Sequence, residues 1–372
     1  MNDPTGPGWH AVEVASTRLE VRVDAAPPHG GRRLWPSVGE YPVYDEFLYY
    51  VMLQDEPRNT LFEQAITAHA QGRTVVELGT GPDLLWSTLA AKHGARRVLA
   101  VEALEHSARE AARRAAALGP HVSVVHGDAT EVELPERGDM CVVELVGAIG
   151  GAEGIADAVA DAWKRHLRPG AVVVPNRVRT RVAALGARRL LGGEPALHPD
   201  VVPYLGEVLR SVGSVFDLRM CLTGLTAADL MTTSDLLEDL DLAADRQHHA
   251  RRLRLEVTRP GAIDSGVLWL ELQCAADQEV LDSLETVTNW MPVLLPFHLS
   301  EPVPVTPGDV LHLDVTRRLF DGVHPEWSFT GSIEHADGSV TPVTAESPYA
   351  DGPFRGSWLH RELLREAAPD TP

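Results

Sequence analysis

The chain has 372 residues, 44% of them hydrophobic, and a formal net charge of −20 at pH 7. This length and apolar content predict a large core divided between two domains. The negative charge disfavours nucleic acid, whose phosphates would be repelled, and favours a cationic partner. We recognise neither a membrane helix nor a secretory signal, and therefore expect a cytoplasmic protein with no membrane partner. The cysteines are widely spaced and odd in number, which favours reduced core thiols over disulfides or a metal site: Cys141, Cys221 and Cys274.

The first 72 residues are expected to form an extension and a pair of helices. Alternating apolar residues in 9–23 predict a short strand pair, and a Pro/Gly-rich break follows, so we interpret residues 1–40 as an N-terminal extension. In residues 41–72, apolar side chains recur at steps of three and four and are interrupted at Pro57. This pattern predicts two short helices.

Residues 73–177 alternate between strand-like and helix-like patterns. The strand-like stretches, such as TVVEL, RVLAVEA and DMCVVEL, are largely apolar without a break, which is typical of strands buried on both faces. The alternation predicts a Rossmann-like α/β domain, built on a mostly parallel sheet with helices on both faces.

Residues 178–372 contain short strand-like segments separated by Gly, Pro and Asp, which predict an antiparallel β-barrel or sandwich as the second domain. An insert at about 186–248, including the acidic stretch DLLEDLDLAAD, has a pattern typical of helices. We interpret it as an oligomerisation arm, with a lid or a packing excursion as the alternative. His248 and His249, at the end of this insert, favour a solvated turn over a metal site.

A glycine-rich turn follows the first strand of the α/β domain. Gly79 and Gly81 would let a ligand approach the backbone closely. The third glycine of a dinucleotide fingerprint is missing, and an acidic residue, Asp83, follows the turn. Glu77, directly before the turn, would repel a pyrophosphate. The turn therefore predicts a cofactor with a positively charged end.

Two further acids follow the next two strands. Glu102 comes about twenty residues after the glycine turn, where a carboxylate accepts both hydroxyls of a ribose. Asp128, with Ala129 beside it, follows the third strand and is suited to an adenine edge. This order of glycine turn, Glu102 and Asp128 is typical of class I methyltransferases that use S-adenosylmethionine.

Glu144 and Glu153 lie in one loop, ELVGAIGGAE, after the fourth strand. Ligands of open α/β sheets bind at the carboxyl ends of the strands, so both acids are expected at the mouth of the site. Two carboxylates about 4 Å apart repel by about 4 kcal/mol at an effective dielectric near 20, and a guanidinium would relieve that repulsion. The pair therefore predicts a guanidinium-bearing or amine-bearing substrate, either a peptide or a small molecule.

The chain resembles the protein arginine methyltransferases from about residue 41 to residue 330. The segment MLQDEPRNTLF is similar to that family's cofactor-covering helices. The resemblance implies that Arg58 holds the cofactor's carboxylate and that Tyr44 or Phe47 lines the active site.

Two other motifs carry the same resemblance. The loop ELVGAIGGAE resembles the family's double-glutamate loop, with Glu144 and Glu153 in the places that hold the substrate. Asn289 and Trp290 are similar to the last two residues of its Thr-His-Trp loop, with asparagine in place of histidine. The family likeness implies a Rossmann-plus-barrel architecture, S-adenosylmethionine as the cofactor and a homodimer formed through the inserted arm.

We therefore expect direct in-line transfer of a methyl group to a substrate nitrogen, without a metal and without a covalent intermediate. Orientation should dominate the catalysis, because holding the two reactants together supplies up to about 7 to 11 kcal/mol. Repulsion between Glu144 and Glu153 is expected to raise the pKa of one of them, so that it accepts the released proton.

Two alternatives remain open. The loop interior is small and glycine-rich, which favours a small-molecule methyltransferase acting on an amine, a guanidine or a carbon centre. A catalytically silent partner that only binds the cofactor and assembles with other chains is the other alternative.

Overall fold

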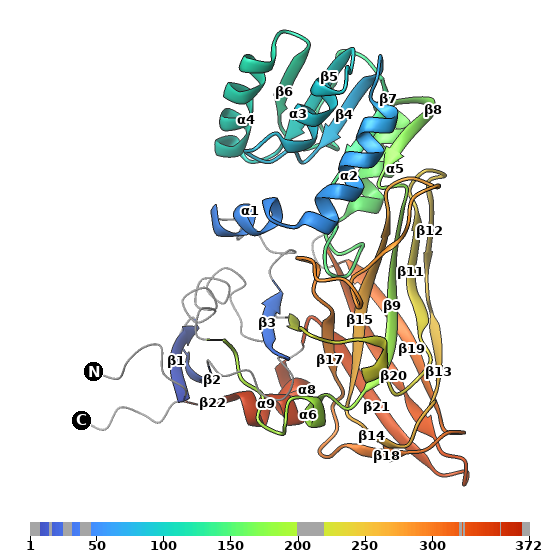
Figure 1. The fold of residues 1–372 in the computed structure, drawn as a ribbon. Coiled ribbons are helices and arrows are strands. Elements are labelled where there is room, and N and C mark those ends of the chain that lie inside the picture. Colours follow the sequence, from blue (N-terminus) through green and yellow to red (C-terminus); the bar gives the residue numbers. More distant parts are fainter. Residues whose placement is uncertain are drawn as a thin grey trace, which may run out of the picture.

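The computed structural model describes residues 8–14, 17–24, 32–37, 46–198, 219–319, 322, 324–349 and 351–366. A parallel-sheet domain lies at one end of the molecule and a larger antiparallel β domain at the other. Helix α1 (Glu46–Leu53) lies between them, and helix α2 (Glu56–His69) runs from there along the α/β domain and packs against it (Figure 1).

The α/β domain has a five-stranded sheet in the order β6-β5-β4-β7-β8, and every neighbouring pair is parallel. The strands are β4 (Thr74–Leu78), β5 (Arg97–Glu102), β6 (Val122–His126), β7 (Gly138–Val143) and β8 (Leu167–Val174). Helices α3 (Leu85–Lys92), α4 (Glu105–Leu118) and α5 (Ile155–Arg165) connect successive strands. β4 is buried along its whole length, as its largely apolar sequence predicts. The predicted Rossmann-like domain is confirmed.

The barrel domain has two main sheets, which are antiparallel throughout. The strand order of the larger sheet is β12-β11-β9-β15-β17-β10-β3, and β16 pairs with β15 at its side. The strand order of the smaller sheet is β13-β19-β20-β21. Strands β14 and β18 form a separate pair. The strands of the larger sheet are β3 (Leu34–Ser37), β9 (Arg177–Leu185), β10 (Arg219–Leu222), β11 (Asp235–Asp241), β12 (Arg246–His249), β15 (Ser265–Gln273), β16 (Leu281–Asp282) and β17 (Val293–Pro296). The others are β13 (Arg252–Glu256), β14 (Gly261–Ile263), β18 (Val303–Val305), β19 (Val310–Leu319), β20 (Pro325–Glu334) and β21 (Val340–Ser347). The predicted antiparallel barrel is confirmed.

Strand β9 shows how the barrel core is divided. Val182 and Ala184 pack into the apolar cluster that also contains side chains of the smaller sheet, whereas Ala183 and Leu185 belong to a second cluster on the opposite face. Successive residues of a strand point to opposite faces, so β9 separates two cores. Nearer its start, the outward positions carry Arg179 and Arg181, which form ion pairs with Glu271 of β15.

The prediction of a helical arm at about 186–248 is wrong for much of its length. Residues 187–190 form the short helix α6 (Ala187–Leu190) and 227–229 a 3₁₀ turn, but β10, β11 and β12 are strands of the larger sheet. The acidic stretch became β11 because it pairs with β9, whose Arg177 neutralises Asp239. His248 and His249 accordingly lie on β12 and not in a turn. Residues 199–218 of the predicted arm lie outside the described residues.

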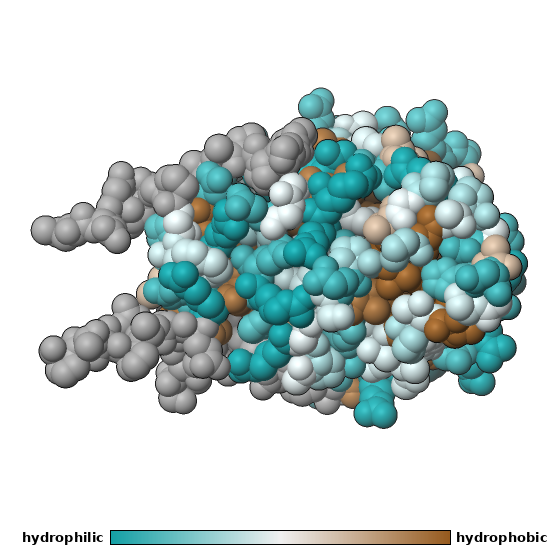
Figure 2. Space-filling view, turned by 90° about the horizontal axis from the view of Figure 1, so that it is seen from below, coloured by the Kyte–Doolittle hydropathy of each residue, from teal (hydrophilic) through white to brown (hydrophobic). Residues whose placement is uncertain are grey.

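The two ends of the described chain meet in a small sheet beside the lower half of the barrel (Figure 1). Strands β1 (Gly8–Val14) and β2 (Thr17–Val23) form the predicted strand pair, and β22 (Leu364–Glu366) pairs with β2. Helices α8 (Asp351–Arg355) and α9 (Trp358–Leu363) precede β22. Seen from below, the described residues present a mostly hydrophilic surface, with groups of apolar residues between the polar ones (Figure 2).

All three cysteines are buried and free, as predicted. Within the described part of the chain, no helix is both long enough and apolar enough to cross a membrane. The same residues contain no group of three or more side chains placed to hold a metal ion.

Candidate active site

The glycine turn lies at the carboxyl end of β4, where both glycines are needed. Gly79 and Gly81 have φ angles of +72° and +63°, a backbone conformation that favours glycine. A Cβ atom on Gly79 would stand 2.9 Å from the Leu145 side chain, and one on Gly81 would stand 3.4 Å from the ring of Tyr49. The turn therefore touches both the double-glutamate loop and helix α1.

Glu102, at the end of β5, is buried beside this turn. Its Oε2 accepts a hydrogen bond of 2.8 Å from the amide of Gly81, and its Oε1 accepts one of 2.8 Å from the amide of Leu104. The carboxylate thus fixes the turn and the start of α4 together. The structure places Glu102 next to the glycine turn, as the sequence order predicted.

Asp128 and Ala129 follow β6 at the same edge of the sheet. Asp128 is exposed, and its Oδ1 accepts hydrogen bonds from the amide and the hydroxyl of Thr130, at 2.7 and 2.6 Å. Ala129 is half-buried, and its carbonyl accepts from Arg165. Asp128 is thus held within its own loop, and Ala129 by a side chain of α5.

Glu77 lies beneath the glycine turn and is 1% exposed. Its Oε2 accepts from the amide of Ser87 at 2.8 Å and from the Ser87 hydroxyl, so it caps the first turn of α3 from a neighbouring strand. Burial raises the pKa of this carboxyl to about 7, and the bonds from Ser87 and Thr80 oppose that rise. Glu77 is therefore an anchor of α3 as well as a titratable group below the turn.

Arg58, on α2, is 3% exposed and forms an ion pair with Glu144. Its Nη1 donates to the carbonyl of Met52 at 3.2 Å and to Asn59 at 2.8 Å. Its guanidinium lies near three aromatic rings, with ring centroids at 5.1, 5.9 and 6.0 Å: Trp86, Trp290 and Phe62. These contacts compensate the buried positive charge.

The ion pair connects two residues that were predicted to have different roles. Arg58 was expected to hold the cofactor and Glu144 the substrate, and the structure places them in direct contact. Burial raises the pKa of Glu144, whereas the charge of Arg58 and its hydrogen bond oppose the rise. The raised pKa was predicted from repulsion by the second glutamate, and the structure gives burial as the main cause.

Glu153 lies nine residues further along the same loop and is half-buried. Its Oε1 is 3.6 Å from the position that a Cβ atom on Gly147 would take. Gly147 comes three residues after Glu144, so the loop folds back on itself and places the carboxylate of Glu153 against its own first half. Its side chain therefore lies beside the loop's own backbone.

Asn289 and Trp290 link the barrel to both parts of the site. The amide of Asn289 donates to Oδ2 of Asp55 at 2.8 Å, and Asp55 caps α2 by accepting from the amide of Arg58. Trp290 is 2% exposed, and its Nε1 donates to the carbonyl of Val146 at 2.6 Å. One barrel loop thus holds the start of α2 and the double-glutamate loop.

The predicted substrate-lining residues are only partly described. Tyr44 lies outside the described residues, and Phe47 lies in α1 with a side chain that is not described. The structure adds Tyr49, which contacts the glycine turn and forms a hydrogen bond with Ser107. Burial raises the pKa of Tyr49. Its place in the predicted cofactor-covering segment is the signal that could have identified it.

One buried polar atom of Arg58 fits the carboxylate end of the predicted cofactor. Its Nε, a donor, is buried and has no hydrogen-bond partner among the described residues. Such an atom is costly to bury unless a ligand or water satisfies it, and a carboxylate near Arg58 would do so. The Glu77 carboxyl, by contrast, has protein partners in the side chains of Ser87 and Thr80.

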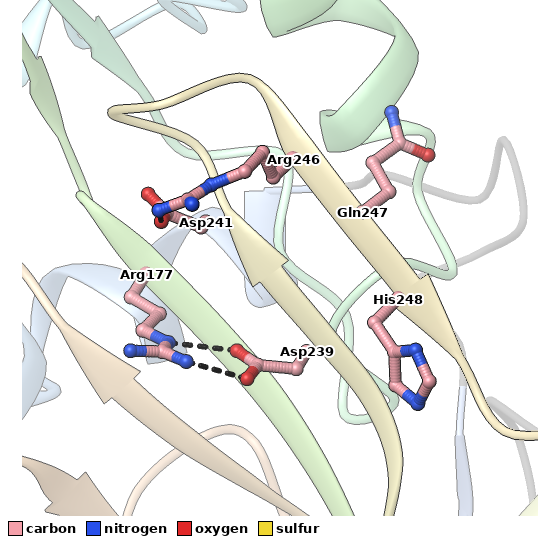
Figure 3. Close-up of a pocket in the computed structure, with 6 residues that line it drawn as sticks. All are labelled: Arg177, Asp239, Asp241, Arg246, Gln247 and His248. Carbon is pink, nitrogen blue, oxygen red and sulfur yellow. Dashed lines mark hydrogen bonds and ion pairs between the residues drawn. The ribbon is translucent and has the colours of Figure 1, made fainter.

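A surface pocket of about 270 Å³ lies elsewhere, on the edge strands of the larger sheet (Figure 3). Arg177 and Asp239 pair with each other across it, as do Arg246 and Asp241. Its charged groups are thus satisfied within the protein, and none of its lining residues belongs to the site described above.

Comparisons with known proteins agree with this geometry. Residues 75–170 match the family described as "Methyltransferase domain". The protein arginine N-methyltransferase PRMT10 of Oryza sativa subsp. japonica is 27% identical over 354 residues, which cover 82% of this chain and 90% of the relative. The probable histone-arginine methyltransferase CARM1 of Oryza sativa subsp. indica is 36% identical over 300 residues, covering 75% of this chain and 55% of the relative.

Two solved structures share the fold. The protein arginine methyltransferase 10 of Arabidopsis thaliana superposes with a TM-score of 0.64 at 19% identity, covering 81% of this chain and 97% of that one. The PRMT1 enzyme-prozyme heterotetrameric complex of Trypanosoma brucei with AdoHcy gives a TM-score of 0.63 at 18% identity, covering 80% of this chain and 96% of that one.

Proposed function

Because the chain belongs to the protein arginine methyltransferase family and is an S-adenosylmethionine-dependent methyltransferase, we propose that it methylates a guanidinium nitrogen held by Glu144 and Glu153. The contact between Arg58 and Glu144 carries this proposal. It joins the residue expected to bind the cofactor to one expected to bind the acceptor, so both reactants would meet at one place.

The cofactor would be held at the carboxyl ends of the parallel strands. Arg58 Nε is available to its carboxylate, Glu77 is proposed to face its ammonium group, and Glu102 is proposed to bind its ribose. S-adenosylmethionine supplies a methyl group on a sulfonium, which a nitrogen lone pair attacks directly. Asp128 and Ala129 are proposed for the adenine edge.

Glu144 and Glu153 would orient the acceptor. A guanidinium is planar and donates two parallel hydrogen bonds to a carboxylate, so this contact fixes its plane as well as its position. Trp290 contributes by fixing the loop through the carbonyl of Val146. When the new N–CH₃ bond forms, the nitrogen loses a proton, and the raised pKa of Glu144 makes it a suitable acceptor.

Substitution of the two glutamates tests the proposal. Glu144→Gln and Glu153→Gln should each lower methyl transfer to arginine-containing peptides by at least about a hundredfold, because an orienting and charge-neutralising contact is lost. Binding of S-adenosylhomocysteine, measured by calorimetry, should change much less for Glu153→Gln than turnover does. Glu271→Gln, which removes a carboxylate on the outer face of the barrel, is the matched control. Near-normal turnover in both loop variants would refute the proposal.

A small-molecule acceptor is the second candidate function. The small, glycine-rich sequence of the loop interior favours this candidate, although Gly150 and Gly151 themselves lie against the barrel. Mass spectrometry of methyl transfer to free arginine and guanidino compounds, compared with arginine-containing peptides, separates the two candidates. Cofactor binding without transfer to any of these acceptors would support the catalytically silent alternative.

We also propose that the chain forms a homodimer. A relative of the same fold is described as a heterotetrameric complex, which supports assembly in this family. Light scattering coupled to size exclusion should give twice the mass of 40.4 kDa, and a monomeric mass would contradict the proposal.

A further inference from the structure

We propose that Thr180 and Glu238, on two neighbouring barrel strands, are positioning residues that set the place of the double-glutamate loop. The inference rests on the proposed function of Glu144 and Glu153. Thr180 lies on β9 and Glu238 on β11, directly opposite each other in the strand register. Both side chains are completely buried.

A short chain of hydrogen bonds connects these side chains to the loop. The amide of Gly150 donates to Oγ1 of Thr180 at 3.0 Å, and that hydroxyl donates to Oε2 of Glu238 at 2.9 Å. The same Oε2 accepts from the amide of Gly151 at 3.3 Å. Two successive backbone amides of the loop are therefore bound by the barrel.

The loop approaches the barrel so closely only because it carries glycines there. A Cβ atom on Gly150 would stand 2.3 Å from a methyl of Val178, and one on Gly151 would stand 2.8 Å from Oε1 of Glu238. Neither glycine has a positive φ angle, so the reason is space and not backbone conformation. At this point the loop has hydrogen bonds to its backbone in place of side-chain packing.

Apolar residues on both sides of the glycines reinforce the attachment. Ala148, Ile149 and Ala152 are buried in the barrel's own core cluster, together with side chains of both main sheets. The middle of the loop is thus part of the barrel, although its two ends belong to the α/β domain. The barrel is consequently able to set where Glu153, two residues after Gly151, is held.

His249 is a third side chain beside Thr180 and Glu238. It lies on β12 opposite Glu238, and its Nδ1 is 3.3 Å from Oε1 of that carboxylate. Its side chain is 24% exposed, so it separates the buried carboxylate from solvent. Nδ1 of His249 and Oε1 of Glu238 are within ion-pair distance but do not form a hydrogen bond, so the carboxylate is hydrogen-bonded through Oε2, to Thr180 and Gly151.

The test compares a variant that removes the hydroxyl of Thr180 with one that keeps it. Thr180→Val keeps the shape of the side chain but removes its donor and its acceptor, whereas Thr180→Ser keeps both. Hydrogen exchange of the peptide covering residues 145–154 should be faster in the valine variant without any acceptor substrate present, and should return to normal in the serine variant. Glu271→Gln, on the same sheet but on its outer face, should leave exchange unchanged.

Activity gives the second measurement. In Thr180→Val, kcat/KM for the acceptor should fall by about tenfold to a hundredfold, since a displacement of about 1 Å has effects of this size. The dissociation constant of S-adenosylhomocysteine should stay within about twofold. Glu238→Met, which keeps the volume and removes both acceptor oxygens, should behave in the same way and gives an independent result if the valine variant does not fold.

Two results would overturn the positioning role. One is unchanged exchange of residues 145–154 in both Thr180→Val and Glu238→Met. The other is an equal loss of activity in Thr180→Val and Thr180→Ser. If the wild-type protein methylates none of the acceptors, the proposed function fails, and the exchange measurement still decides whether the barrel holds the loop.

Discussion

Replacing Glu77 by glutamine should stabilise the folded chain relative to the wild-type protein, and this difference should grow as the pH rises. Glu77 is completely buried, and burial raises the pKa of its carboxyl from 4.5 to about 7. A raised pKa means that the folded state binds the proton more tightly than the unfolded state does. The stability that this proton contributes is fully present below about pH 4.5 and is lost as the pH rises through 7.

The size of the effect follows from the two pKa values. The difference of about 2.5 between 4.5 and 7, at 1.36 kcal/mol for each pKa unit, corresponds to about 3 kcal/mol in total. Between pH 5.5 and pH 8, about 2 kcal/mol of this should be lost from the wild-type protein. Glutamine does not titrate, and its carbonyl oxygen is still able to accept a hydrogen bond from the amide of Ser87.

The assay is urea unfolding of both proteins at several pH values between 5.5 and 8, without cofactor, followed by tryptophan fluorescence. Asp264 is also buried, with a pKa raised to about 6, but it titrates in both proteins and cancels in the difference. The free energy of unfolding of the variant minus that of the wild type should rise by about 2 kcal/mol across this range. A difference that stays constant within about 0.5 kcal/mol would refute the reasoning.

Three further predictions concern the same site. Arg58→Ala should destabilise the protein by about 3 to 5 kcal/mol in urea unfolding, because it leaves a buried carboxylate without its partner, and a change below about 1 kcal/mol would contradict the buried ion pair. Trp290→Phe should cost about 1 kcal/mol by losing the bond to the carbonyl of Val146, and should lower kcat while calorimetry shows unchanged cofactor affinity. Gly79→Ala should be more destabilising than Gly170→Ala, since both φ angles are positive but only Gly79 has a neighbouring side chain within 4 Å of the new methyl group. Equal melting temperatures of the two alanine variants would show that the contact at the turn is unimportant.

The sequence predicted the α/β domain nearly element by element. Each strand of that sheet is a largely apolar run closed by a polar or glycine-rich turn, so local pattern and tertiary position agree. The same holds for Gly79, Gly81 and Glu102, because residues that follow parallel strands meet at one edge of the sheet. The predicted sequence order therefore corresponds to a spatial cluster.

Strand β11 shows where the predicted secondary structure was wrong, because its residues had been assigned to a helix. Its leucines and acids fit a helix as well as a strand, and acidic residues are unfavourable in strands. The pairing with β9 decided the outcome, since Arg177 lies 62 residues away and supplies the charge that Asp239 needs. A local reading of the sequence contains no information on such a partner.

The types of group in the site and their order along the chain follow from the sequence alone: a glycine turn, an acid after each of the next strands, and two glutamates in one loop. Only the tertiary structure decided which of them are buried and which of them touch. Burial sets the pKa of Glu77 and Glu144, and contacts between distant segments pair Arg58 with Glu144 and attach the loop to Thr180. Both depend on how separate elements pack, and packing is a property of the whole fold and not of any segment.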